Sequence, residues 1–334
     1  MDDELRALAA GHPAGLVTAR RLVEVGWAPT SIQRMTRDGA LARVRRGVYA
    51  PRAAWEAAGP DERFRMRIHA ESLQADGPLV VSHRAAAAMH RLPAAVPWPE
   101  AIETFFAGAT GGRSGGRRSV RRVGPEPEVE LVDGVAVTSL TRTLADVATT
   151  QSWRWSVPML DAALRAAVLG AGGGRRPREP FDAMDAAAPM RARVYAEIEC
   201  LGRRRGRRRA EASVAFADPL AENAGESLSR VVIHELGFEA PELQVRFEEV
   251  FDGAAVVDFL WRRLRRIGEF DGRLKYTRSR AISGRDAGSV VFREKQREDA
   301  LRRLGFGVVR WGWSTLHDPA GFAARLRAAG VPQR

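Results

Sequence analysis

Two apolar, strand-like runs near the C-terminus carry three carboxylates: Asp258 in VVDFLW, and Glu269 and Asp271 in RIGEFDG. Side chains alternate along a strand, so a hairpin whose turn is centred on the intervening RRLRR stretch places Asp258 opposite Glu269. Asp271 then shares their face, next to apolar residues that bury it in part. Like charges that lie opposite one another destabilise a sheet, and burial increases the cost. The pattern therefore predicts a positive group between the acids, and a hard divalent cation suits such oxygen ligands.

A third carboxylate ligand is available from Glu226, on a helix expected at about residues 222–236. The spacing of Asn223 and Glu226 is also that of a capping box, so the sequence leaves open whether Glu226 binds a cation or only caps the helix. Basic residues gather in the same part of the chain. The expected phosphate contacts beside the carboxylates are Arg263, Arg265, Lys295 and Arg297.

The elements expected in residues 215–334 follow the order α-β-β-β-α-β, which is that of the PD-(D/E)XK nuclease core. The motifs GESLSR, VVDFLW, EFDGRLKY and FREKQREDALRRLGFGVVRW, within about residues 220–315, resemble very-short-patch-repair-like endonuclease domains. The resemblance implies that Glu226, Asp258 and Glu269 bind Mg²⁺ or Mn²⁺. The metal would then activate a water for hydrolysis of a DNA phosphodiester.

One position departs from the pattern of that family. Asp271 stands where a lysine usually follows the acidic ligand. Lys275 could reach back into the site in its place, or Lys295 or Gln296 on the following helix could substitute. Two alternatives follow. In the first, the domain is a metal-dependent endonuclease with Glu226, Asp258, Glu269 and Lys275 as catalytic residues and Asp271 as a further metal ligand. In the second, the domain is an inactive nuclease scaffold that binds DNA or a partner.

The first 55 residues predict a small DNA-binding head. Thr18 is placed to cap a second helix, and a third helix is expected in PTSIQRMTRDG, where Thr30 and a glutamine three residues later have capping-box spacing. A basic hairpin, ALARVRRGVYA, follows. This order resembles a winged helix-turn-helix, whose third helix enters the major groove and whose wing contacts the backbone. The expected base contacts are Gln33, Arg34 and Arg37, and the expected phosphate contacts are Arg43, Arg45 and Arg46. The alternative is a protein-interaction module with solvated arginines.

A formal net charge of +12 indicates a polyanionic partner, here double-stranded DNA, although an arginine-rich composition can also reflect a GC-rich genome. The chain has one cysteine, Cys200, which excludes an internal disulfide and a zinc cluster built on cysteines. The N-terminus lacks the pattern of a signal peptide, and no run of about 18 apolar residues could span a bilayer. We therefore expect a cytoplasmic protein without a membrane partner.

Residues 1 to about 170 resemble a second family. The motifs GALARVRRGVYAP, VVSHRAAAAMHRLP and VTSLTRTLADVA are similar to AbiEi-type antitoxins of bacterial type IV toxin–antitoxin systems. The resemblance implies a winged helix that represses its own operon, a middle domain for interaction or further DNA contact, and a cognate toxin as a partner. In the third motif, Arg142 and Asp146 have the spacing of a helix-surface ion pair. The sequence leaves the oligomeric state open, and a dimer on a symmetric site is compatible with it.

Two glycine-rich stretches, residues 108–122 and 170–180, and the arginine run LGRRRGRRRA divide the chain. We expect a multidomain protein of the α+β or α/β class. Its parts are a winged helix-turn-helix head (1–55), a mixed α/β antitoxin-like domain (56–170), a Gly/Arg-rich linker (171–214) and a nuclease-like domain with a restriction-endonuclease-like core (215–334).

Overall fold

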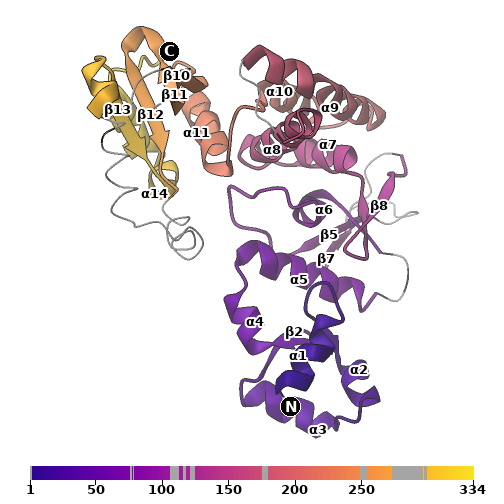
Figure 1. Ribbon diagram of the computed structural model, residues 1–334. Helices are drawn as coiled ribbons and strands as arrows, with labels where there is room; N and C mark the ends of the chain where they lie inside the picture. Colours follow the sequence, from indigo (N-terminus) through magenta and orange to yellow (C-terminus); the bar gives the residue numbers. More distant parts are fainter. Residues whose placement is uncertain are drawn as a thin grey trace. The chain divides into compact units, whose positions relative to one another are not determined.

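The computed structural model describes residues 2–75, 77, 79–105, 113–115, 118–120, 125–174, 180–248, 254–272, 296 and 299–334. The chain forms two compact units, Met1–Met159 with Met190–Ala215, and Leu160–Pro189 with Phe216–Arg334. Described strands form three small sheets, of three, six and four strands, and helices pack around them (Figure 1). The prediction of a mixed α/β, multidomain protein is confirmed. The four domain ranges given above stay a prediction.

The head consists of three helices and a small antiparallel sheet of order β1-β3-β2. Its elements are α1 (Asp2–Ala10), β1 (Val17–Thr18), α2 (Ala19–Glu24), α3 (Pro29–Arg37), β2 (Leu41–Arg45) and β3 (Val48–Pro51). One apolar cluster holds them together, formed by Leu5, Val17, Leu22, Ile32, Met35 and Leu41. The three helices and the hairpin are consistent with a winged helix, as predicted.

Of the two helix caps predicted in the head, one is present and the other is not. Thr18 caps α2 as predicted, because its hydroxyl accepts a hydrogen bond from the backbone N–H of Arg21 at 3.1 Å. The capping box predicted at Thr30 is wrong. Helix α3 begins one residue earlier, at Pro29, and its N-cap residue Ala28 makes no side-chain cap. Proline is favoured at the first helical position because its fixed φ fits the helix and its missing N–H is not needed there.

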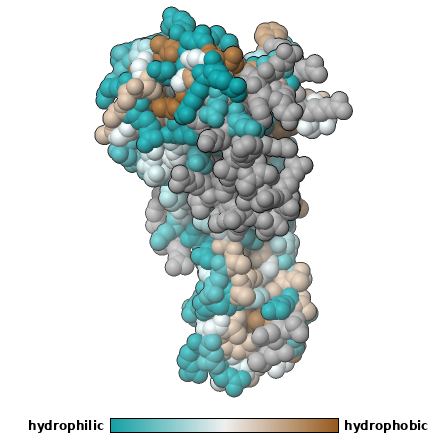
Figure 2. All heavy atoms as spheres, turned by 60° about the vertical axis from the view of Figure 1, so that its left-hand side comes forward, coloured by the Kyte–Doolittle hydropathy of each residue, from teal (hydrophilic) through white to brown (hydrophobic). Residues whose placement is uncertain are grey.

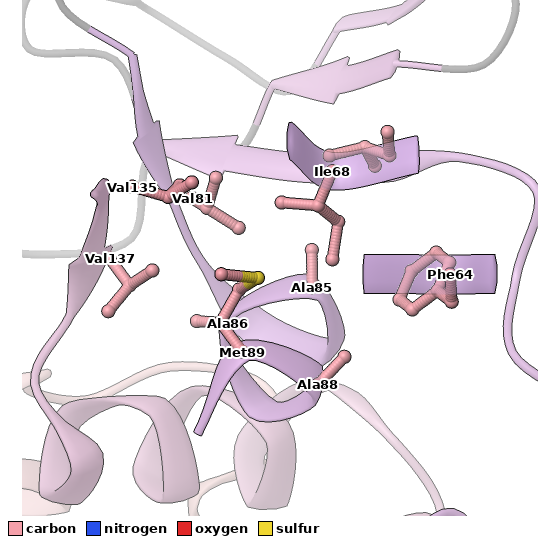
Figure 3. Packing of buried hydrophobic residues seen from close by; sticks show 10 residues of the cluster. Phe64, Ile68, Val81, Ala85, Ala86, Ala88, Met89, Val135 and Val137 are labelled. Carbon is pink, nitrogen blue, oxygen red and sulfur yellow. The ribbon is translucent and has the colours of Figure 1, made fainter. Parts of the chain in front are cut away.

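The six-stranded sheet of the same unit has the order β6-β7-β5-β4-β9-β8. Small alanines of one helix pack with Phe64 and Ile68 against Val81 and Val137 of the sheet, so helix and sheet approach closely (Figure 3). The elements are α4 (Arg52–Ala57), α5 (Pro60–Ser72), β4 (Val80–Val81), the alanine-rich α6 (His83–Met89), β5 (Ile102–Phe105), β6 (Arg113–Gly115), β7 (Arg118–Val120), β8 (Val129–Val132), β9 (Val135–Thr138) and α7 (Leu140–Thr150).

Two segments expected to be irregular contain regular structure. Residues 108–122 include β6 and β7, which pair as an antiparallel hairpin. Residues 171–214, expected as a linker, include all of α9 (Pro180–Cys200) and most of α10 (Arg207–Phe216), which follow α8 (Trp153–Ala171). The glycines and arginines that suggested a linker lie mainly between these helices. The residues of α9 and α10 themselves are rich in alanine and other good helix formers, which favours continuous helices.

In the second unit, a four-stranded sheet has the order β10-β11-β12-β13, with β13 parallel to β12 and the other pairs antiparallel. Helix α11 lies on the face that carries Phe270 and Trp311. A Cβ on Gly225 would lie 2.0 Å from the ring of Phe270, and the Trp311 indole N–H donates to the hydroxyl of Ser229 at 2.8 Å. The elements are α11 (Ala224–Glu235), β10 (Glu242–Phe247), β11 (Ala255–Trp261), a 3₁₀ turn (Arg262–Leu264), β12 (Arg266–Phe270), β13 (Gly307–Trp311), α14 (Trp313–Leu316) and α15 (Pro319–Ala328).

Hydrophilic residues cover much of the described surface on the face drawn in Figure 2, with hydrophobic residues in small patches among them. Among the helices of the described residues, none is both long enough and apolar enough to cross a membrane.

Candidate nucleic-acid interface

Helix α3 presents two different faces. Ile32 and Met35 are buried in the core of the head, whereas Gln33, Arg34 and Arg37 are exposed. The last two guanidiniums make no hydrogen bond to a neighbouring element among the described residues, and Arg37 has only a weak, exposed contact of 3.7 Å with the adjacent Asp38. The three side chains predicted to contact bases therefore point away from the protein.

A groove of about 500 Å³ lies between α2 and α3. Gln33 lines it on one side and Val23 on the other, with Tyr49 of the sheet nearby. Its lining combines apolar side chains with the charged Arg20 and Glu24.

The wing arginines do not share one environment. Arg43 and Arg46 are exposed, in agreement with a contact to a polyanion. Arg45 instead forms an ion pair with Glu71 of α5, whose side chain is 1% exposed, and its Nε donates to the Gln74 side chain at 3.2 Å. A buried carboxylate needs a cation within reach, and here the wing supplies it. Arg45 is therefore held against the protein, which differs from its predicted contact with phosphate.

Gln74 also fixes the tip of the wing. Its amide donates to the backbone carbonyl of Arg46, and a Cβ on Gly47 would lie 3.0 Å from its nitrogen. Gly47 has φ of 69°, which favours glycine. Glu71 and Gln74 were missed in the sequence because nothing near the wing marks them as its partners.

The carboxylates of the second unit are arranged by a hairpin with the predicted register. Phe259 lies opposite Gly268, and continuing this register by one residue places Asp258 opposite Glu269. Arg265 closes the turn at φ 50°. Past the Asp258–Glu269 position, the backbone N–H of Phe270 donates to Asp258 Oδ2 at 2.8 Å. The Asp258 side chain thus accepts a bond there in place of a backbone carbonyl of β11.

Glu226 lies beside Asp258, and an amide joins them. The Gln244 Nε2 group donates to Glu226 Oε2 at 2.9 Å and to Asp258 Oδ1 at 3.4 Å. Glu226 also accepts from the backbone N–H of Glu222 at 2.8 Å and from the Asn223 side chain. Asn223 in turn caps α11. The cap was one of the two predicted roles of Glu226, and it forms together with the link to Asp258 through Gln244.

Burial, with a further contribution from the charge of Asp258, raises the pKa of Glu226 from 4.5 to about 8. Its side chain is 4% exposed, so the charged form loses most of its hydration. At neutral pH a proton on Glu226 therefore relieves the repulsion between the two acids. The sequence reasoning missed Gln244, which could be found only by knowing the register of β10 against β11.

Glu269 and Asp271 have other surroundings. Glu269 Oε2 forms an ion pair of 3.1 Å with Arg310, its neighbour across the parallel strands β12 and β13. Asp271 lines a pocket of about 560 Å³ together with Arg310, Trp313 and Arg325. Arg310 was also missed, because parallel pairing brings it from a distant part of the sequence.

The other predicted phosphate contacts of this unit are engaged or lie outside the described residues. Arg263 pairs with Glu239 at 3.3 Å, and Arg265 donates to the backbone carbonyls of Leu304 and Gly305. Lys295 and Arg297 lie outside the described residues, as does Lys275, which was predicted as a catalytic residue.

A divalent cation needs several oxygen ligands with free lone pairs. Within the described part of the chain, no group of three or more His, Cys, Asp or Glu side chains is arranged to hold a metal ion. Glu226 and Asp258 accept hydrogen bonds from N–H donors, and Glu269 binds a guanidinium. The described residues therefore do not fit the three-carboxylate site that the nuclease resemblance implies.

Comparison with known proteins assigns the head. No curated protein matches the chain. The crystal structure of the RV2827C protein from Mycobacterium tuberculosis is similar to it, with 18% identity over 64% of this chain and 80% of that chain and a TM-score of 0.33. A likeness of that size says nothing about function. Residues 3–52 match the family described as "Transcriptional regulator, AbiEi antitoxin". The protein therefore carries an N-terminal AbiEi antitoxin (transcriptional regulator) domain.

Proposed function

We propose that the protein is a DNA-binding transcriptional regulator whose head reads duplex DNA through α3. The observation that supports this best is the division of α3, where Ile32 and Met35 are buried while Gln33, Arg34 and Arg37 are exposed. This helix lies inside the segment that matches a family of transcriptional regulators. A helix anchored on one face and lined with hydrogen-bonding side chains on the other suits the major groove.

The chemistry of these side chains suits base edges. A guanidinium can donate two hydrogen bonds to guanine O6 and N7, and a glutamine amide can bond adenine N6 and N7. Arg43 and Arg46, exposed on the wing, are suited to phosphate oxygens, which set the register of the protein on the duplex. Arg45 supports the wing from inside.

The test begins with footprinting on the DNA upstream of the protein's own gene, which defines a binding site. Fluorescence anisotropy then compares that site with an unrelated duplex for the wild type and for Arg34→Ala/Arg37→Ala. We expect the double variant to lose about a hundredfold in affinity for its site and less for the unrelated duplex. Arg6→Ala, at an exposed arginine of α1, is the control. Unchanged discrimination in the double variant would show that α3 does not read bases.

A nuclease is the second candidate function. The order of α11, the three antiparallel strands and β13, and the closeness of Glu226 and Asp258, favour it. The engagement of Glu226, Asp258 and Glu269 by N–H donors and Arg310 weighs against a cation there, so binding of Mg²⁺ or Mn²⁺ stays a prediction. We therefore infer that this unit binds DNA or a partner without cleaving DNA, and a cognate toxin is the partner suggested by the name of the matching family.

A plasmid-nicking assay tests this inference. The wild type and Glu269→Ala are incubated with supercoiled plasmid in Mg²⁺ and, separately, in Mn²⁺. We expect no nicking above a protein-free control in either metal. Nicking by the wild type that disappears in Glu269→Ala would instead establish the nuclease.

A further inference from the structure

A second basic surface lies outside the head, in the turn between α9 and α10 and the first turn of α10. Six of the seven residues 203–209 are arginines, with Gly206 in the middle. The structure divides the six into two groups of three. One group holds the turn in place, and the other faces solvent.

The first group consists of Arg204, Arg207 and Arg209. Arg204 Nε donates to the backbone carbonyl of Leu201 at 2.7 Å, and burial lowers the pKa of its guanidinium. Arg207 forms an ion pair of 2.7 Å with Glu211, one turn along α10. Arg209 donates to the carbonyl of Thr149, in the last turn of α7. The bond to Thr149 ties the segment to α7, and the other two fix it locally.

Gly206 brings the turn still closer to α7. It has φ of 98°, and a Cβ at this position would lie 2.1 Å from the carbonyl oxygen of Thr149. Any other residue would push the turn away from α7. The backbone that carries the arginines is therefore fixed by packing as well as by hydrogen bonds.

The second group consists of Arg203, Arg205 and Arg208, which are exposed. Within the described part of the chain, these three side chains have no hydrogen bond, ion pair or ring contact. Three like charges held on one short, fixed segment repel one another, and among the described residues no acid forms an ion pair with them. Basic residues in the first turn of α10 add a further cost, because the helix N-terminus is itself positive.

An anionic partner with closely spaced charges would offset both costs. Phosphates along a duplex supply such charges, and the guanidinium group can bind a phosphate through two parallel hydrogen bonds. Duplex DNA is the polyanion that the head of the same compact unit is proposed to bind, so we take DNA, and not an acidic protein, as the partner of the turn. We propose that residues 203–209 form a second DNA contact, which binds phosphates through Arg203, Arg205 and Arg208 without reading sequence. The choice of DNA as the polyanion rests on the proposed function.

The test uses the full chain and measures how affinity for DNA depends on salt. Arg203→Ala/Arg205→Ala/Arg208→Ala removes the exposed group and leaves the anchoring group intact, so the turn is expected to keep its fold, as circular dichroism and melting will report. The control Arg91→Ala/Arg193→Ala/Arg334→Ala removes the same total charge from dispersed, exposed positions. Anisotropy is recorded between 50 and 300 mM salt, on the footprinted site and on unrelated duplexes of increasing length.

In the triple variant we expect the plot of log affinity against log salt to become shallower. The magnitude of its slope should decrease by about 2 to 3, since each phosphate contact contributes about 0.9. This loss should occur on both kinds of duplex once they are long enough to reach the turn, with discrimination between them unchanged. A slope equal to that of the control would overturn the proposal. The proposal would also be overturned if the triple variant kept the salt slope on DNA but lost binding to poly-glutamate. That result would indicate an acidic protein as the partner of the turn.

The two proposals can fail separately. If Arg34→Ala/Arg37→Ala keeps its discrimination while the triple variant loses salt dependence, the second contact stands and the reading head is wrong. If the double variant loses discrimination while the triple variant matches its control, only the second contact is wrong.

Discussion

The head and the C-terminal unit use their charged side chains in opposite ways. On α3, Arg34 and Arg37 are exposed and remain hydrated. In the C-terminal unit, Glu226 and Asp258 are covered by neighbouring elements and accept hydrogen bonds from backbone and amide N–H groups. A hydrated side chain can exchange water for a ligand at little cost, whereas these two acids already use several of their lone pairs within the protein. Charge and spacing alone therefore do not distinguish a binding surface from an internal network.

The largest expected effect that tests the contrast between the two regions is the pH dependence of stability that Glu226 causes in the C-terminal unit. Its pKa is raised from 4.5 to about 8, so the folded protein keeps a proton that the unfolded chain releases. The stability that this proton provides is fully present below about pH 4.5 and is lost as pH rises through about 8. We expect the contribution of Glu226 to lower the unfolding free energy of the C-terminal unit by up to roughly 1.4 kcal/mol per pH unit over that range. Burial also raises the pKa of Asp161, in the same unit, to about 6, so Glu226→Gln should remove the slope above about pH 6.

The measurement is urea unfolding at pH 5 to 9, followed by hydrogen-exchange mass spectrometry on peptides of β11 and β12. Glu235→Gln, at an exposed position of the same helix, is the control. Each series is repeated with Mg²⁺ and with Mn²⁺. If either ion removed the slope in the wild type, the two acids would be a cation site and the contrast with the head would fail.

The second effect tests Arg45 of the head, which is held by an internal ion pair as the acids of the C-terminal unit are held by internal contacts. Arg45→Ala leaves Glu71 buried without the ion pair, and we expect a loss of about 2 to 3 kcal/mol in the stability of the first unit. The value lies below the roughly 3 to 5 kcal/mol typical of fully buried pairs because Arg45 is 37% exposed. The salt dependence of DNA binding should not change. Arg46→Ala should do the reverse, leaving stability unchanged and lowering the salt slope by about 0.9.

Thermal melting and anisotropy on the same samples provide both readouts. Arg46→Ala is the matched control, since the two arginines are adjacent in the wing. A reduced salt slope for Arg45→Ala without loss of stability would place Arg45 on the DNA, as the sequence alone suggested.

Local patterns predicted what depends on local geometry. The periodicity of α3 predicted that Gln33, Arg34 and Arg37 point away from Ile32 and Met35, because helix faces follow from spacing alone. The register of Asp258 against Glu269 was predicted because a short turn fixes which residues of a hairpin lie opposite one another.

Partners that come from distant parts of the chain were not predicted. Gln244 reaches Glu226 and Asp258 from another strand, and Arg310 reaches Glu269 through parallel pairing. The sequence gives no spacing rule for such contacts.

For the pair of Arg142 and Asp146, the sequence predicted the contact correctly but its location incorrectly. Its helical spacing predicted the contact, which is present at 3.2 Å. The expected surface location was wrong, since both side chains are 2% exposed. Whether a helix face meets solvent depends on the elements that cover it, and the spacing within α7 does not contain that information.

The smallest effect concerns Glu269 and Arg310, a pair between the two extremes. Glu269 is 12% exposed and Arg310 is 38% exposed, so water screens their attraction in part. A double-mutant cycle with Glu269→Gln and Arg310→Met, measured by urea unfolding of the C-terminal unit, should give a coupling of about 0.5 to 1 kcal/mol. The coupling should shrink between 0.1 and 0.5 M salt, because screening acts on pairs that are open to solvent. A coupling near zero, together with stabilisation of the wild type but not of Glu269→Gln by Mn²⁺, would show that Glu269 serves a cation instead of Arg310. The C-terminal unit would then keep its acids ready for an external ligand, as the head keeps its arginines.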